Sequence, residues 1–205
     1  MKTKLTFVLI LSLMVSFTYG QKITKAKKGV IEALDKKEAG YATMAMEIWQ
    51  QAEIGYQEYK SCVLLQDNLK TEGFAVEEGV AGLPTGFIAS YGSGGPVIAI
   101  LAEYDALPGV SQEAVPYRKE RTDGAKAGHA CGHHLFGTGA VAAAVEVKNW
   151  LISSGTKGTI RVYGTPAEEG GSGKVYMARD GLFDDVDIAM YWHAGNQNSV
   201  RVASN

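Results

Sequence analysis

Three of the chain's four histidines and one of its two cysteines fall within six residues, in the segment from Gly128 to His134. Imidazole and thiolate groups are the side chains with which proteins bind zinc and related divalent ions. Cys131 and His133 are two positions apart, so in an extended loop both side chains leave the same face and can reach one metal ion. The cluster therefore predicts a metal site. A structural cysteine in a glycine-containing turn, with histidines that face solvent, is the alternative.

The segment that follows this cluster, residues 135–151, is apolar and rich in alanine, which predicts a helix. Cys131 would then lie near the N-terminus of that helix. There the helix dipole stabilises the thiolate form of cysteine, which is the form that binds metal.

Three predicted strands each end close to a carboxylate or an imidazole. The strands and the residues after them are 96–102 with Glu103 and Asp105, 158–164 with Glu168 and Glu169, and 186–192 with His193. In open α/β sheets, functional sites form beyond the carboxyl ends of the strands. We therefore expect these side chains to share one site with the histidine and cysteine cluster.

The predicted ligands of the site are a thiolate, two imidazoles and a carboxylate: Cys131, His133, His193 and Glu169. Such a mixed set suits zinc, with manganese or cobalt as alternatives where carboxylates dominate. A cysteine sulfur can bridge two ions, yet four side chains are too few to fill two coordination spheres. The site therefore holds either one ion, or two ions with further ligands from elsewhere.

Glu168 and Glu169 are neighbours at a predicted strand end, so their side chains point in different directions. Glu169 can then bind metal while Glu168 faces the substrate as a general base. A metal lowers the pKa of bound water, and a nearby carboxylate can accept its proton, which makes amide hydrolysis the natural reaction. Two acids that stabilise a helix N-terminus are the alternative.

The remaining polar residues are expected beside the ligands without binding the metal. Asp105 is the natural carboxylate to orient a ligating imidazole, and a loop cap is its alternative role. Glu103 is expected either near the metal or at the surface. His129 and His134 are expected to surround the ligands.

The order of predicted elements indicates an α/β fold with a mostly parallel sheet flanked by helices. A polar loop at 109–127 is unusually long, and long loops often carry function. The predicted helices are 22–37, 41–51, 59–71, 135–151 and 174–181, and the predicted strands are 74–76, 86–91, 96–102, 158–164 and 186–192.

Residues 1–20 predict a signal peptide. Two lysines and an apolar run, 5–17, precede small residues at the expected cleavage site before Gln21. The apolar run is shorter than the roughly 20 residues of a membrane-spanning helix. We therefore expect an exported protein, periplasmic or secreted, with no membrane attachment after cleavage. A retained N-terminal anchor is the alternative.

The net charge of −2 provides no basic surface for nucleic acid. Two cysteines in an exported chain leave open a disulfide between Cys62 and Cys131. That bridge would indicate a disulfide-stabilised binding domain in place of a metal site.

Four ordered segments resemble the aminoacylase/carboxypeptidase family of metallopeptidases. They are Glu103-Tyr104-Asp105-Ala106-Leu107-Pro108, Gly128-His129-Ala130-Cys131-Gly132-His133, Pro166-Ala167-Glu168-Glu169-Gly170-Gly171 and the strand-end His193. The resemblance spans roughly residues 25–200. It points to the amidohydrolase branch that includes aminobenzoyl-glutamate hydrolase and related dipeptidases.

That resemblance implies a phosphorylase/hydrolase-like catalytic domain that hydrolyses amide bonds with two divalent metal ions, zinc or manganese. Cys131, His133, Glu169 and His193 would be the ligands and Glu168 the general base. The substrate would be a small peptide or an N-acyl-amino acid, and full-length relatives form homodimers or larger oligomers.

Two positions depart from the family pattern. His134 stands where this branch usually has Asp or Asn, and Glu103 stands where other branches carry a ligating histidine. Family members also carry a lid or dimerisation domain and a further histidine ligand after the region of His193, and the 205-residue sequence contains neither. We therefore expect residues 21–205 to form the N-terminal part of an incomplete catalytic domain that is inactive or nearly so alone. A non-catalytic metal-binding or interaction module, truncated or degenerate, is the alternative function.

Overall fold

The computed structural model describes residues 23–197, 199, 200 and 202. The predicted signal peptide, residues 1–20, lies outside the described residues. Among the described helices, none combines the length and the apolar character that a membrane crossing requires.

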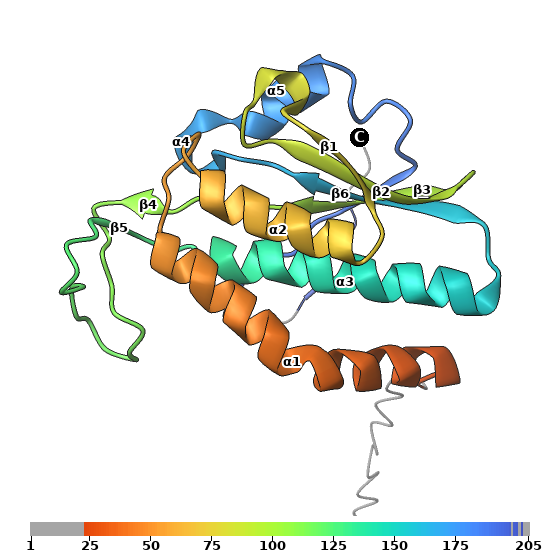
Figure 1. Cartoon of the computed structure of the whole chain (residues 1–205), viewed down its shortest axis with the longest axis horizontal. Helices are drawn as coiled ribbons and strands as arrows, with labels where there is room; N and C mark the ends of the chain where they lie inside the picture. Colours follow the sequence, from red (N-terminus) through yellow and green to blue (C-terminus); the bar gives the residue numbers. More distant parts are fainter. Residues whose placement is uncertain (1–22, 198, 201, 203–205) are drawn as a thin grey trace, which may run out of the picture.

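A five-stranded sheet forms the centre of the fold, in the order β1-β2-β6-β3-β7 (Figure 1). Its strands are β1 (Ala75–Glu78), β2 (Phe87–Ser93), β6 (Gly158–Gly164), β3 (Val97–Ala102) and β7 (Ile188–Met190). β6 pairs in parallel with β3 and β3 with β7, whereas β2 is antiparallel to both β1 and β6. Four strands therefore run in one direction and only β2 opposes them, which confirms the predicted α/β fold with a mostly parallel sheet. A separate ribbon pairs β4 (Leu107–Pro108) with β5 (Ala127–Gly128).

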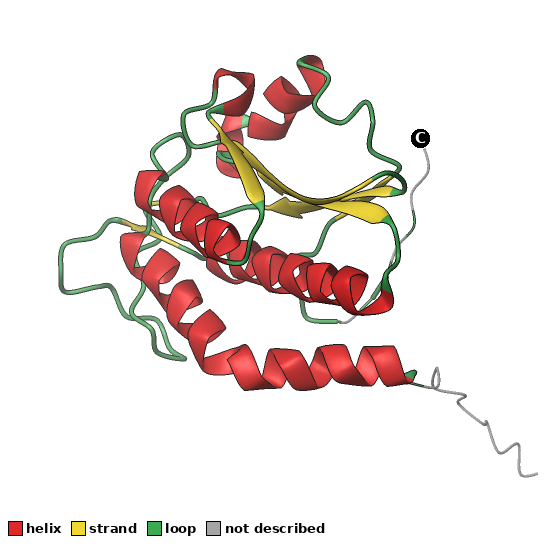
Figure 2. Cartoon of the chain, turned by 45° about the vertical axis from the view of Figure 1, so that its right-hand side comes forward, coloured by secondary structure: helices red, strands yellow, loops and turns green. Residues whose placement is uncertain are grey.

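Helices cover both faces of the sheet. Figure 2 shows the long helices on one face and the short helical segments on the other. The long helices are α1 (Lys25–Gln51), α2 (Tyr59–Thr71) and α3 (His133–Ser154), and the short ones are η1 (Val80–Gly82), α4 (Glu168–Gly171) and α5 (Gly173–Arg179). The larger core lies under the long helices and includes Ile48, Leu65, Ala89, Val141 and Ile160. A smaller core under α5 includes Leu83, Ala99, Tyr163 and Met177.

The first helix differs from its prediction. The sequence predicts separate helices at 22–37 and 41–51, but α1 is one helix whose ribbon bends between its two halves (Figure 1). Gly40 is exposed within it, and a glycine in an exposed helix interior costs only about 1 kcal/mol relative to alanine. No proline interrupts the segment, so the packing of α1 on α3 carries the helix through that position.

Helix α3 approaches the end of β3 closely because Gly137 has no side chain. A Cβ at Gly137 would lie 2.7 Å from the backbone oxygen of Glu103, which is closer than real contacts allow. This approach brings the first turn of α3, with His133, against the residues that follow β3. A position inside a predicted helix therefore sets the geometry of the candidate site.

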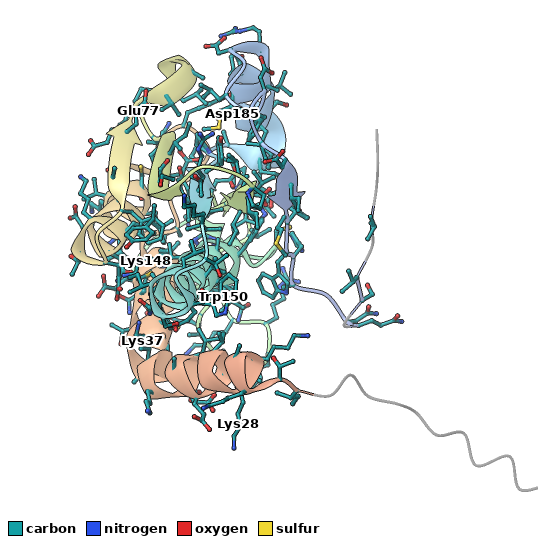
Figure 3. All side chains as sticks on the ribbon, turned by 90° about the vertical axis from the view of Figure 1, so that its right-hand side faces the viewer. Lys28, Lys37, Glu77, Lys148, Trp150 and Asp185 are labelled. Carbon is teal, nitrogen blue, oxygen red and sulfur yellow. The ribbon has the colours of Figure 1, made fainter. Side chains whose placement is uncertain are left out.

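Ion pairs, partly buried, join the three long helices to one another. Lys148 of α3 donates to Glu72 (Nζ–Oε2 2.9 Å), and Lys37 of α1 donates to Glu146 of α3 (Nζ–Oε1 3.0 Å). Lys37 and Lys148 are both labelled in Figure 3. Lys37 also lies 3.6 Å from Glu72, so the four side chains form one ion-pair network on the helical face.

Candidate metal centre

His133, the first residue of α3, is held from behind by Asp105. Its Nδ1 lies 2.8 Å from Asp105 Oδ1 and 3.1 Å from the Asp105 backbone oxygen. Both neighbours accept hydrogen bonds, so Nδ1 carries a proton and Nε2 points the other way, into the site. Asp105 therefore holds the ring of His133 in a fixed orientation.

Cys131 and His193 meet on the opposite side of the same space. The Cys131 Sγ lies 3.2 Å from His193 Nε2, and His193 Nδ1 lies 2.8 Å from the backbone oxygen of Ala194. The ring proton of His193 is thereby directed to the backbone, which leaves Nε2 facing the sulfur. Potential ligand atoms of Cys131, His133 and His193 all lie within 4.8 Å of one another.

Glu168 and Glu169 begin α4 and approach His133 from the end of β6. Glu168 Oε2 lies 3.9 Å and Glu169 Oε1 lies 4.0 Å from His133 Nε2. The Glu168 side chain is 39% exposed, whereas that of Glu169 is 16% exposed. The two neighbours thus differ in exposure: Glu168 faces solvent and Glu169 turns inward.

Glu103 lies inside the site, which decides between the two positions that the sequence leaves open. It is completely buried, and its Oε2 lies 3.0 Å from His133 Nε2, so the two form an ion pair when His133 is protonated. Its other oxygen, Oε1, accepts a hydrogen bond from Lys174 of α5. Glu103, His133 and Glu168 form a second group of potential ligands within 4.8 Å. Because His133 offers one free ring nitrogen, only one ion can use it.

Three buried atoms in this space lack a hydrogen-bond partner within the described part of the chain: Glu103 Oε2, His133 Nε2 and Glu169 Oε1. Buried polar atoms are almost always partnered, and leaving one unpartnered is costly. Two are carboxylate oxygens and one is an imidazole nitrogen, and they lie beside a cysteine sulfur. This donor set fits a divalent metal ion of the zinc type.

The acids of the site set the protonation of its two central ligands. Burial lowers the pKa of His133, but the carboxylates of Asp105 and Glu103 outweigh it and raise that pKa to about 10. Burial, followed by the carboxylates of Glu169 and Glu168, raises the pKa of Cys131 to about 11.

The sequence predicts the opposite shift for Cys131, from the dipole of the following helix. That prediction is wrong for the metal-free chain, because burial of the sulfur and the acids that other segments bring beside it raise the pKa, and together they outweigh the dipole. A bound cation would reverse this balance.

His129 and His134 lie against α1, and neither belongs to the two groups of potential ligands. His129 Nε2 lies 3.0 Å from the backbone oxygen of Ile48, and the ring of His134 packs edge-on against Trp49 at 4.9 Å. Burial lowers the pKa of each histidine to about 4, so both are neutral at physiological pH. The structure thus brings together seven of the nine predicted site residues and places these two to one side.

The disulfide alternative is not formed. Cys62 and Cys131 are both free. Cys62 is buried in the larger core, where the side-chain amide of Gln66 donates to its sulfur at 3.0 Å. Burial raises the pKa of the Cys62 thiol to about 12, so this cysteine is an inert core residue.

Two residues at the site were not predicted from the sequence. Lys174 pairs with Glu103 across 71 positions, and Glu58 accepts a hydrogen bond from the N–H of Ala167 across 109 positions. Neither residue belongs to a motif that indicates a particular chemistry. Only the tertiary contact reveals them.

Residues 99–203 match the model of peptidase family M20/M25/M40. The chain is 47% identical over 162 residues to a subunit of the p-aminobenzoyl-glutamate hydrolase of Escherichia coli, covering 79% of this chain and 34% of that protein. It is 30% identical over 185 residues to Xaa-Arg dipeptidase of Mus musculus, covering 84% and 39%.

The solved structure of a dinuclear metal-binding M20 peptidase from Bacillus subtilis superposes with a TM-score of 0.65 at 27% identity, covering 77% of this chain and 43% of that one. The chain thus spans less than half the length of these relatives. The fold, the matched segment and these likenesses agree: the chain belongs to the M20/M25/M40 family of peptidases.

Proposed function

We propose that the protein is a metal-dependent amide hydrolase that cleaves an N-acyl-amino acid or a small dipeptide. The observation that carries this proposal is the set of three unpartnered buried atoms on Glu103, His133 and Glu169, next to the contact between Cys131 and His193. Family membership supports the reaction class.

Cys131, His133, Glu169 and His193 would hold the metal, which we propose to be one or two zinc or manganese ions. When bound, such an ion polarises an amide carbonyl and lowers the pKa of water. The chain's own residues prepare the site for it. Asp105 fixes the ring of His133, and the backbone oxygen of Ala194 fixes the ring of His193.

Glu168 would act as the general base and then as the general acid. Its side chain is 39% exposed, so it can reach a water molecule and a substrate on the open side of the site. A positioned carboxylate can take a proton from the attacking water and pass it to the leaving amine. Glu169, which is turned inward, is not placed to exchange protons with the substrate in this way.

The substrate class follows from the two curated relatives, whose names describe an acyl-glutamate hydrolase and a dipeptidase. We further propose that the protein is exported, with residues 1–20 as its signal peptide and residues 21–205 as the N-terminal part of the catalytic domain. Self-association is proposed by analogy with family members. Because the chain covers 34% of the Escherichia coli relative, we expect the 205 residues alone to hydrolyse slowly or not at all.

Two measurements test this proposal. Native mass spectrometry of the metal-stripped chain after addition of zinc or manganese should show one or two bound ions. A form extended to the length of the relatives should hydrolyse p-aminobenzoyl-glutamate or members of a dipeptide panel, and a chelator should abolish that hydrolysis. Metal uptake without hydrolysis in the extended form would instead support a non-catalytic metal-binding module. The absence of any metal uptake would refute both the hydrolase and the metal-binding module.

A further inference from the structure

The connector between α1 and α2, residues 52–58, lies against the candidate site. Ile54 forms a parallel β-bridge with Ala106, and the Ala106 N–H donates to the backbone oxygen of Glu53 at 2.8 Å. Ala106 directly follows Asp105. The connector is thus fixed to the segment that orients the metal ligands.

Glu58, at the end of this connector, is completely buried and uses both of its carboxylate oxygens. Oε1 accepts a hydrogen bond from the backbone N–H of Ala167 at 2.8 Å, and Oε2 accepts one from the hydroxyl of Thr85 at 2.9 Å. Ala167 immediately precedes Glu168. A buried carboxylate therefore binds the chain one residue before the proposed base.

Ala167 is held in an unfavourable backbone conformation. Its φ of 55° and ψ of 45° lie in the left-handed region, which residues other than glycine seldom adopt. Two glycines make room for it: a Cβ at Gly55 would lie 2.9 Å from the Ala167 Cβ, and a Cβ at Gly171 would lie 2.5 Å from it. Strain of this kind persists only where the surroundings impose it.

The other side of the turn is bound in the same way. Asp105 Oδ2 accepts a hydrogen bond from the N–H of Glu169 at 2.8 Å, while Asp105 Oδ1 contacts His133. Two buried carboxylates, Glu58 and Asp105, thus hold the N–H groups directly before and directly after Glu168. The directions in which the side chains of Glu168 and Glu169 point therefore depend on both carboxylates.

We propose that Glu58 is a positioning residue of the site: by binding Ala167 in its left-handed conformation, it directs Glu168 toward the open side and Glu169 toward the metal ligands. The effect of this positioning on metal binding and catalysis rests on the proposed function. The contact itself is independent of any bound ion.

The test compares three substitutions by amide hydrogen exchange and by zinc affinity. Glu58→Leu removes the acceptor, so exchange at the N–H groups of Ala167 and Glu169 should accelerate about tenfold or more, and zinc should bind about tenfold more weakly. Glu58→Gln keeps a carbonyl oxygen for Ala167 and turns its amide toward the Thr85 hydroxyl, which can accept. It should therefore stay within about threefold of wild type in both measurements.

Glu146→Leu is the matched control, because it removes another buried carboxylate at a distance from the turn. It should leave exchange at Ala167 and Glu169, and zinc affinity, within about threefold of wild type. If Glu58→Leu also leaves both quantities within threefold, or if Glu146→Leu shifts them as much as Glu58→Leu does, the positioning role is refuted.

Should Glu58→Leu fail to fold, the double variant Glu58→Leu/Ala167→Gly decides, because glycine adopts the left-handed conformation without help. Recovery of folding and of zinc affinity in the double variant supports the proposal, and failure to recover counts against it. If the wild-type chain takes up no zinc, the proposed function fails, but the exchange rates still decide whether Glu58 holds the turn.

Discussion

Charged side chains gather in two regions of the molecule, and the regions differ in how those charges are paired. On the helical face, Lys148 binds Glu72 at 2.9 Å and Lys37 binds Glu146 at 3.0 Å. At the carboxyl ends of the strands, Glu103, His133 and Glu169 each present a buried atom without a partner among the described residues. The first region pairs its charges within the chain, whereas the second leaves potential ligand atoms that, in our proposal, a metal ion would bind.

This difference separates a structural role from a functional one. In the helical network, each cation lies beside a carboxylate, so none of the charges is left unpaired. In the strand-end cluster, one imidazole faces three carboxylates, and the acids raise the pKa of His133 to about 10. A proton on His133 partly balances that negative charge in the metal-free chain. A divalent cation would balance it further.

The largest effect is expected from Glu168→Gln. This substitution removes the proposed base but none of the proposed ligands, so turnover in a hydrolytically active form should fall about 10²- to 10⁴-fold. Zinc affinity should stay nearly unchanged. Steady-state kinetics and a zinc titration measure the two quantities, and unimpaired turnover would exclude Glu168 as the base.

The pH dependence of metal uptake should come next in size. In the metal-free chain the pKa of Cys131 is raised to about 11 and that of His133 to about 10, so both hold protons at pH 7 that a metal must displace. Affinity should therefore rise with pH between about 6 and 9, by up to about a hundredfold per pH unit if both protons leave. Calorimetry in buffers of different ionisation enthalpy counts these protons. Uptake with no proton release would contradict the assignment of these two ligands.

Asp105→Asn weakens the support of the His133 ring, a proposed metal ligand. The carboxylate accepts hydrogen bonds from both His133 and the N–H of Glu169, whereas an amide has only one accepting oxygen. Zinc affinity should therefore fall about 10- to 100-fold. Competition against a chromophoric chelator gives the ratio to wild type. An unchanged affinity would show that His133 is oriented without Asp105.

The smallest effect on the site is expected from the helical network. Lys148→Met leaves Glu72 without its nearer cation, so the free energy of unfolding should fall by about 1–3 kcal/mol. Zinc affinity should change less than twofold. Urea unfolding in the presence of a chelator measures the stability. A loss of zinc affinity as large as that of Asp105→Asn would remove the distinction between the two regions.

Sequence reasoning predicted those features that depend on local pattern. Apolar runs placed β3 and β6, and polar residues after them placed Asp105 and Glu169 at the carboxyl edge of the sheet. The predicted strand 186–192 is longer than the observed β7, which spans only Ile188–Met190. Helix α2 at Tyr59–Thr71 matches its predicted range.

Features that depend on contacts between distant segments could not be predicted in this way. The pKa of Cys131 follows from burial and from the acids that the fold brings to it, and the proposed role of Glu58 follows from a hydrogen bond across 109 positions. The position of Glu103 was likewise open, because its burial depends on the approach of α3 at Gly137. A single sequence carries no local signal for such contacts.

The central claim is that thiolate, imidazole and carboxylate side chains from separate strand ends bind one divalent ion. A cobalt(II) titration of the metal-stripped chain tests it directly, because a thiolate ligand adds a charge-transfer absorption that carboxylates and imidazoles do not give. We predict a saturable band in the wild-type chain that disappears in Cys131→Ser, while Cys62→Ser retains it. A wild-type chain with no such band, or a band that persists in Cys131→Ser, would contradict the account.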